Sequence, residues 1–193
     1  MQPVEAPAPA NILSALERLE AGQPYKVADA ELNMVRQRVR RLVREFNETP
    51  EDLHLVRSRQ LASMLGSLGD DPSVEAPLFL EYGRHVFAGD RLVIGPHCVI
   101  IDAGRITIGD DVRLGPAVHL YAVSRPINPE HRAWEQAAPI TIGDRVWIGG
   151  HSVVNPGVTI GAGTTIGPGS VVLEDVPAGV YASGNPCRVI KEL

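Results

Sequence analysis

The stretch YAVSRPINPEHR, residues 121–132, gathers polar side chains in an otherwise regular sequence. Arg125 stands directly before a proline. Its guanidinium is always protonated and offers only donors, so it cannot take a proton from a hydroxyl group. It can instead bind a carboxylate or phosphate, or stabilise a developing negative charge. An equally weighted interpretation is that Arg125 only caps this loop.

Several histidines are candidates for acid or base chemistry, because imidazole titrates near neutrality. His131 lies in the same loop, His97 lies in IGPHC, and His151 lies in GGHSV. Each is a candidate general base, although a single loop histidine is more often solvated. Ser124 has no evident adjacent base, which disfavours covalent catalysis at its hydroxyl group.

The first part of the chain reads as a pair of helices. Apolar residues recur at steps of three and four over 29–46, which predicts an amphipathic helix with Asp29 as its N-cap. The motif TPED predicts a second helix capped by Thr49, reaching Leu65 and stopped by Gly66. The following stretch, GSLGDDPSVEAP, reads as a linker.

Beyond the linker, the apolar period changes to six. Aliphatic residues, most of them followed by glycine, mark the repeat at Ile94, Ile108, Leu114, Ile142, Ile148, Val154, Ile160 and Ile166, with Ala88 and Ile100 as weaker members. A hexapeptide period predicts a parallel β-helix with one short strand and one turn per unit, the aliphatic residues stacking inward. A β-sandwich would show strands at spacings of eight to twelve residues, and that spacing is absent.

These patterns divide the chain into five parts. We predict a flexible tail (1–10), a helical leader (11–66), a linker and entry (67–80), a β-helix (81–177) with an inserted loop (121–138), and a C-terminal segment (178–193). Long irregular insertions in a compact repeat are more often functional than structural. The loop is therefore the first place to look for a site.

Composition excludes several functions. The formal net charge of −5 gives no general attraction to nucleic acid or to an anionic membrane. Cys98 and Cys187 lie far apart without metal-ligating partners, which favours a reduced protein without a metal site. No secretory signal or membrane-span pattern is present, so we expect a cytoplasmic protein without a membrane span.

Four motifs resemble the hexapeptide-repeat acyltransferases, and within them the maltose, galactoside and nodulation-factor O-acetyltransferases. They are GQPYKVADAEL, EYGRHVFAG, PITIGDRVWIGGHSVVNPGVTIG and GNPCRVIKEL, and the likeness covers nearly all of the chain beyond residue 20. The resemblance implies a left-handed parallel β-helix and a homotrimer. It also implies that acetyl-CoA lies in a groove between neighbouring subunits, where the loop at 121–138 completes the active site.

The resemblance assigns acceptor chemistry to particular positions. Arg125 stands where the family has its catalytic histidine, which is the main departure from the pattern. Asp102 matches the family's acceptor-binding aspartate. Gly95 replaces an asparagine that positions acceptor sugars, and Val27 replaces an acid in the leader. The acceptor-binding part is therefore only partly preserved.

The resemblance also implies a CoA-binding set. The predicted members are Trp147, Gly149, Gly150, Gly167, Glu174 and Arg188. The amides of Gly149 and Gly150 could form an oxyanion site. Glu174 replaces a lysine, and an acid there would repel the phosphates of CoA.

The leading expectation is an O-acetyltransferase that uses acetyl-CoA or another acyl-CoA and acts on a sugar or another small hydroxylated acceptor. The alternative is a catalytically silent relative that serves as a ligand-binding or assembly subunit, which Arg125, Glu174 and Gly95 together favour. A purely structural β-helix is disfavoured, because such proteins need neither a helical leader nor a long inserted loop.

Overall fold

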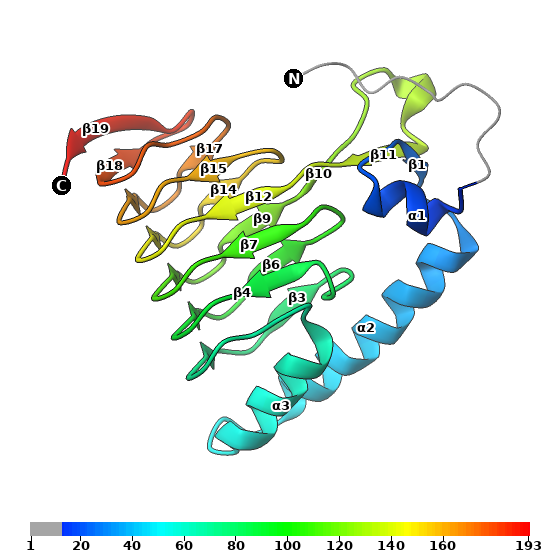
Figure 1. The fold of residues 1–193 in the computed structure, drawn as a ribbon, viewed down its shortest axis with the longest axis horizontal. Helices are drawn as coiled ribbons and strands as arrows, with labels where there is room; N and C mark the ends of the chain where they lie inside the picture. The colour runs from blue at the N-terminus through cyan, green and yellow to red at the C-terminus, as the bar shows by residue number, and fades with distance from the viewer. Residues whose placement is uncertain (1–12) are drawn as a thin grey trace.

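The computed structural model describes residues 13–193, so the predicted flexible tail at 1–10 lies outside the described residues. The chain forms a parallel β-helix with a helical leader beside it (Figure 1). This confirms the fold predicted from the hexapeptide period.

The described part of the leader contains three helices. Helix α1 (Ala15–Glu20) begins with a capping box, in which Ser14 Oγ accepts from the amide of Glu17. Helix α2 (Ala30–Glu48) begins as predicted, because Asp29 Oδ1 accepts the amide of Glu31 at 2.8 Å. The apolar side of α2, with Val39, Val43 and Phe46, packs against the β-helix, as its amphipathic pattern predicts.

Helix α3 (His54–Met64) starts later than predicted. Leu53 stands at its N-cap position and makes no side-chain cap. The Thr49 hydroxyl group instead donates to the carbonyl of Glu45 at 2.7 Å, which closes the last turn of α2. The cap predicted from TPED is therefore wrong, although α3 ends at Met64 with Leu65 as its C-cap, close to the predicted end.

Three parallel sheets form the walls of the β-helix. Sheet I contains β4 (Val86–Ala88), β7 (Ile106–Ile108), β12 (Ile140–Ile142) and β15 (Thr159–Ile160). Sheet II contains β2 (Ser73–Val74), β5 (Val93–Ile94), β8 (Arg113–Leu114), β13 (Trp147–Ile148), β16 (Thr165–Ile166), β18 (Val180–Ser183) and the antiparallel β19 (Arg188–Glu192). Sheet III contains β3 (Leu78–Leu80), β6 (Cys98–Ile101), β9 (His119–Tyr121), β14 (Val153–Val154) and β17 (Val171–Val172).

The strand register stacks like residues inside the β-helix. Ile142 pairs with Ile108 on one side and with Ile160 on the other. Every aliphatic residue of the predicted row is buried, including the weaker members Ala88 and Ile100. The inward assignment is confirmed, and burial of this column is the main favourable contribution to the fold.

The β-helix is longer than predicted at both ends. The segment at 67–80, expected as a linker and entry, contains β2 and β3, which pair in parallel with β5 and β6. Beyond residue 177, β18 pairs in parallel with β16, so the coil continues into the expected C-terminal segment. Both extensions lack the full hexapeptide pattern, so the pattern did not predict them.

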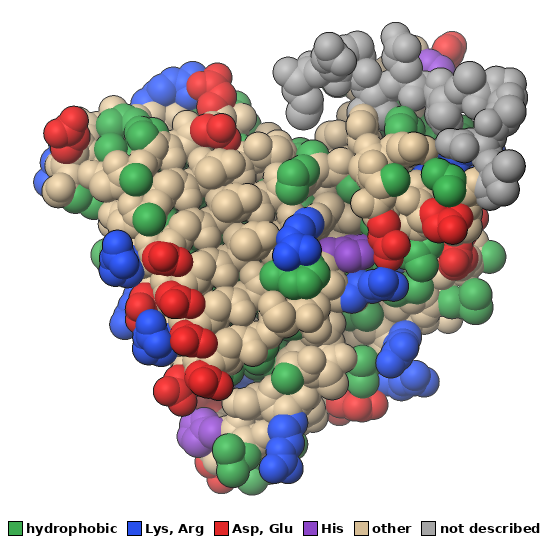
Figure 2. Space-filling view, in the orientation of Figure 1, with side chains coloured by type: hydrophobic (Ala, Val, Ile, Leu, Met, Phe, Trp, Pro, Cys, Tyr) green, Lys and Arg blue, Asp and Glu red, His purple; other side chains and the backbone are tan. Residues whose placement is uncertain are grey.

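Acidic side chains gather in a column along one edge of the β-helix, on the left in Figure 2. In the turns that follow the strands of sheet I, Asp110 Oδ1 accepts the amide of Asp90 at 2.8 Å, and Asp144 Oδ1 accepts that of Asp110 at 3.0 Å. Each carboxylate thus satisfies a turn amide of the preceding coil. Asp110 and Asp144 therefore have a structural role in the turns.

Candidate functional site

The inserted loop is an ordered hairpin rather than an irregular excursion. Its strands β10 (Val123–Ser124) and β11 (Trp134–Ala137) pair antiparallel, and a 3-10 turn (Pro129–His131) lies between them. Strand β1 of the leader (Tyr25–Lys26) pairs with the other edge of β11. The hairpin therefore lies beside α1 and β1 (Figure 1) and is held by the leader of its own chain.

Arg125 is held at the base of this hairpin by a buried carboxylate. Its Nε donates to Glu135 Oε1 at 2.5 Å, and the hydroxyl group of Tyr25 donates to Glu135 Oε2 at 2.9 Å. The Glu135 side chain is 5% exposed, whereas that of Arg125 is 62% exposed. Nε and Nη2 of Arg125 thus neutralise the Glu135 carboxylate, while the rest of the guanidinium is exposed to solvent.

A hollow of about 440 Å³ opens where the hairpin leaves the β-helix. Arg125 and Glu135 line it from the hairpin, Glu81 from the turn after β3, Tyr121 from β9, and Asn155 from the turn after β14. Ser124 of β10 also lines it, so two carboxylates, two hydroxyl groups and an amide meet beside the guanidinium. Such a mixture of donors and acceptors suits a small hydroxylated ligand.

Glu81 is the titratable group that stands out in this hollow. Burial, and then the nearby charge of Glu135, raise its pKa to about 7, while Arg36 opposes that shift. Arg36 Nη1 lies 3.9 Å from Glu81 Oε1, and the same nitrogen donates to the Tyr82 hydroxyl group at 2.8 Å. The cation is therefore shared and offsets the burial of Glu81 only in part.

Sequence reasoning missed both Glu81 and Glu135 as site residues. Glu81 begins the motif EYGR, which served only as a landmark of the resemblance, and Glu135 lies in a loop without a repeat. No local signal marks either one, because their surroundings are assembled from segments far apart in the chain.

Asp102, predicted to bind the acceptor, is fully buried. Its carboxylate accepts the amide of Tyr82 at 2.9 Å and that of His85 at 3.3 Å. Burial raises its pKa, and the backbone hydrogen bonds oppose the shift. In this chain Asp102 fixes the turn that carries Glu81, and direct contact with an acceptor stays a prediction.

The predicted histidines lie away from the hollow. His131 ends the short 3-10 turn at the tip of the hairpin, whereas His97 and His151 lie exposed at turns with positive φ. None of these three lines the hollow beside Arg125. The structure therefore does not bring them together with the arginine.

The predicted CoA-binding residues lie mainly along sheet II. Trp147 is 54% exposed and stands between Arg113 and Thr165 in the register. The Gly149 amide already donates to the Ile166 carbonyl at 2.8 Å, while no such bond occupies the amide of Gly150 among the described backbone pairs. An oxyanion role for this pair stays a prediction.

The remaining predicted CoA-binding residues lie near the C-terminal end. A side chain at Gly167 would overlap the side chains of Ser183 and Tyr181, so these would have to move to admit one. Glu174 Oε2 lies 3.6 Å from Arg188 Nη1, and both side chains are exposed. The repulsion expected between Glu174 and an anionic ligand is therefore partly offset by its neighbour.

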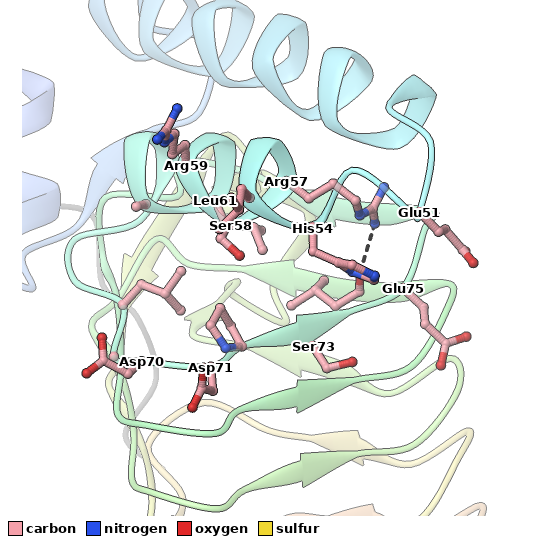
Figure 3. A pocket seen from close by; sticks show the side chains of 16 residues that line it. Glu51, His54, Arg57, Ser58, Arg59, Leu61, Asp70, Asp71, Ser73 and Glu75 are labelled. Carbon is pink, nitrogen blue, oxygen red and sulfur yellow. Dashed lines mark hydrogen bonds between the residues drawn. The ribbon is translucent and has the colours of Figure 1, made fainter.

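A second hollow, of about 720 Å³, lies between α3 and the first coil (Figure 3). Arg57 on its wall donates to the carbonyls of Val74 at 2.8 Å and Thr49 at 2.7 Å. These bonds join α3 to β2 and to the end of α2, so the arginine is used structurally. The hollow contains none of the predicted site residues.

Two further observations concern residues 13–193. No helix in this part of the chain is long and apolar enough to cross a membrane. Nor does this part contain a group of three or more histidine, cysteine, aspartate or glutamate side chains placed to hold a metal ion.

Comparison with known families gives two matches along the chain. Residues 139–174 match the bacterial transferase hexapeptide (six repeats), and residues 18–69 match the maltose acetyltransferase hexapeptide capping motif. The first match lies in the β-helix, and the second covers the helical leader.

Individual relatives span the whole fold. Galactoside O-acetyltransferase of Escherichia coli (strain K12) is 37% identical over 179 residues, which are 92% of this chain and 88% of the relative. A maltose O-acetyltransferase structure from Clostridium difficile 630 has a TM-score of 0.91 at 38% identity, covering 95% of this chain and 99% of that chain. A hexapeptide-repeat acetyltransferase from Vibrio cholerae, complexed with acetyl-CoA, has a TM-score of 0.86 at 36% identity, covering 94% and 99%.

Proposed function

Because this chain belongs to the hexapeptide-repeat acetyltransferases of the galactoside and maltose O-acetyltransferase type, we propose that it acetylates a hydroxyl group of a sugar or another small hydroxylated compound. Acetyl-CoA is the acetyl donor in this reaction. The observation that carries the proposal is that the likeness extends over leader, hairpin and β-helix together, so the parts that form the hollow are all present.

The reaction takes place between subunits of a homotrimer. In support, the outward side chains of sheet III form a largely apolar column on one wall of the β-helix. Its members are Phe79, Val99, His119, Val153 and Val171. Apolar side chains in register on an outer wall favour burial against another copy of the chain, and contact of this wall with a different face of its neighbour can close into a ring of three. The hollow beside Arg125 is open, so a neighbouring β-helix can complete it.

Arg125 is a positioning residue in this proposal. Its guanidinium cannot accept the acceptor proton, and its ion pair with Glu135 joins the two strands of the hairpin. Its exposed face can donate to an acceptor oxygen. Loss of the family's histidine therefore changes how the acceptor is deprotonated without removing the hollow.

A second candidate function is that of a catalytically silent binding or assembly subunit. The ion pair of Arg125 with Glu135 favours it, because the residue at the family's catalytic position is used to fix the loop. The two functions differ in turnover alone, since both allow CoA to bind.

The test measures thiol release from acetyl-CoA by the full-length protein with a panel of sugars, and confirms the acetylated product by mass spectrometry. We expect acceptor-dependent thiol release well above the acceptor-free rate. Binding of CoA without turnover on any acceptor would favour the silent subunit. Light scattering tests the trimer, and a monomeric protein at micromolar concentration would contradict the shared site.

A further inference from the structure

We propose that Glu81 is the general base that removes the proton from the acceptor hydroxyl group, in place of the residue that the loop no longer supplies. This inference rests on the proposed acetyl transfer and adds a residue to it. The geometry that carries it is the juxtaposition of Glu81 with Arg125 across one hollow.

Glu81 is placed to meet a small acceptor. It stands on the turn directly after β3 and lines the hollow from the β-helix, opposite the hairpin that carries Arg125. Its side chain is 17% exposed, so a ligand can reach it although most of it is out of water. A base in this position faces the bound acceptor.

The second glutamate of the hollow is not available in the same way. Arg125 donates to one carboxylate oxygen of Glu135, and Tyr25 donates to the other. The nearest cationic nitrogen to Glu81 is that of Arg36 at 3.9 Å, which is beyond hydrogen-bonding distance. Of the two carboxylates, Glu81 is therefore the one free to accept a proton from a ligand.

The charges around Glu81 favour a proton affinity suited to this role. The charged and titratable groups that act on it or respond to it include Arg36 and Arg40 on α2, Glu135 on β11, Asp102 after β6, Tyr25 on β1 and the neighbouring Tyr82. Arg125 and Tyr121 line the same hollow. Burial and the two carboxylates raise the pKa of Glu81 to about 7, against the opposing arginines. A base is most effective when its pKa lies near the working pH.

The proposed step is a proton transfer coupled to acetyl transfer. The Glu81 carboxylate takes the proton of the acceptor hydroxyl group as its oxygen forms a bond to the carbonyl carbon of the acetyl thioester. The tetrahedral intermediate collapses, the carbon–sulfur bond breaks, and CoA leaves as a thiolate. The proton held by Glu81 passes to that thiolate or to solvent, which restores the base.

The experiment compares Glu81→Gln, which keeps the shape of the side chain, with the exposed control Glu48→Gln on α2. We expect Glu81→Gln to lower kcat by about 10²–10⁴-fold while CoA affinity stays unchanged, because general-base catalysis is typically worth that factor. The control should match the wild type. In the wild type kcat/KM, which reports the ionisation of the free enzyme, should rise with pH through a group titrating near 7, and this limb should be absent in Glu81→Gln.

Chemical rescue separates a base from a merely structural residue. In Glu81→Ala, added formate should restore part of the lost kcat, because a small carboxylate can occupy the vacated space and accept the proton. A structural role would give no rescue. This arm also applies if Glu81→Gln does not fold, since circular dichroism identifies which variants can be compared.

The outcomes distinguish the two proposals. Turnover by the wild type, with the pH limb and more than a tenth of kcat retained in Glu81→Gln, would overturn the role of Glu81 and leave acetyl transfer standing. Loss of kcat without formate rescue in Glu81→Ala would overturn the base role as well. A wild type without turnover on any hydroxylated acceptor would overturn both proposals.

Discussion

The ion pair of Arg125 with Glu135 should contribute measurably to the free energy of unfolding. Replacing Arg125 with alanine leaves a carboxylate whose side chain is 5% exposed with Tyr25 as its remaining hydrogen-bond donor. Removing one partner of a fully buried pair costs about 3–5 kcal/mol, because it leaves an uncompensated charge. The Arg125 side chain is itself 62% exposed, so water can enter the vacated space and screen the carboxylate.

We therefore expect Arg125→Ala to lower the free energy of unfolding by about 1–2 kcal/mol. The matched control is Arg84→Ala, which removes an ion pair with Glu20 of similar length, 2.9 Å, between two exposed side chains. Exposed pairs contribute about 0–1 kcal/mol, so this variant should change stability much less.

The assay is urea unfolding at a fixed protomer concentration, since assembly makes apparent stability concentration-dependent. Glu135→Gln and the double variant complete the cycle and isolate the interaction between the two side chains. The coupling should be on the order of 1 kcal/mol in favour of the native pair. If Arg125→Ala costs no more than Arg84→Ala and the coupling is zero, the pair does not hold the hairpin.

Three further outcomes are expected. Ile160→Asp places an unpaired charge in the fully buried column, so it should cost several kcal/mol and abolish the fold; a soluble protein with an unchanged melting temperature would contradict the inward stack. Glu174→Lys should strengthen CoA binding by roughly 1 kcal/mol, although Arg188 already offsets part of the charge of Glu174. Calorimetry at low salt measures this affinity, and an unchanged value would place this turn away from the ligand. The pKa of Glu81 in the folded chain, about 7, lies above the ordinary carboxyl value, so the wild type should lose stability as pH rises from about 4.5 to about 7. In urea unfolding across that window, the stability of Glu81→Gln should depend less on pH, and parallel curves for the two proteins would contradict the raised pKa.

The sequence predicted the β-helix well because its constraint is local and repeated. Each unit must place an aliphatic residue inward and turn within six positions, so the period of the sequence alone predicts the column from Ile142 to Ile166. The coils at the ends were less visible. Their outer edges meet the leader or β19, which relaxes the need for a full hexapeptide there.

The candidate site was only partly predictable, because its chemistry arises from distant segments. The resemblance located the loop and Arg125, but the partner of Arg125 depends on the hairpin register that brings Glu135 beneath it. Likewise the raised pKa of Glu81 comes from burial and from the carboxylates of Glu135 on β11 and Asp102, against the arginines of α2. Periodicity within one element carries no information about such neighbours.

The pairing of β1 with β11 has a consequence for how the chain is made. Tyr25 donates to Glu135, a residue 110 positions later, and among residues 13–193 its strand pairs with β11 of that hairpin alone. At a synthesis rate of roughly 5–20 residues per second, the ribosome needs about 6–22 s to supply those residues. The leader therefore emerges first but completes its sheet only after the hairpin has left the ribosome, so a nascent chain arrested before β11 must hold Tyr25 unpaired.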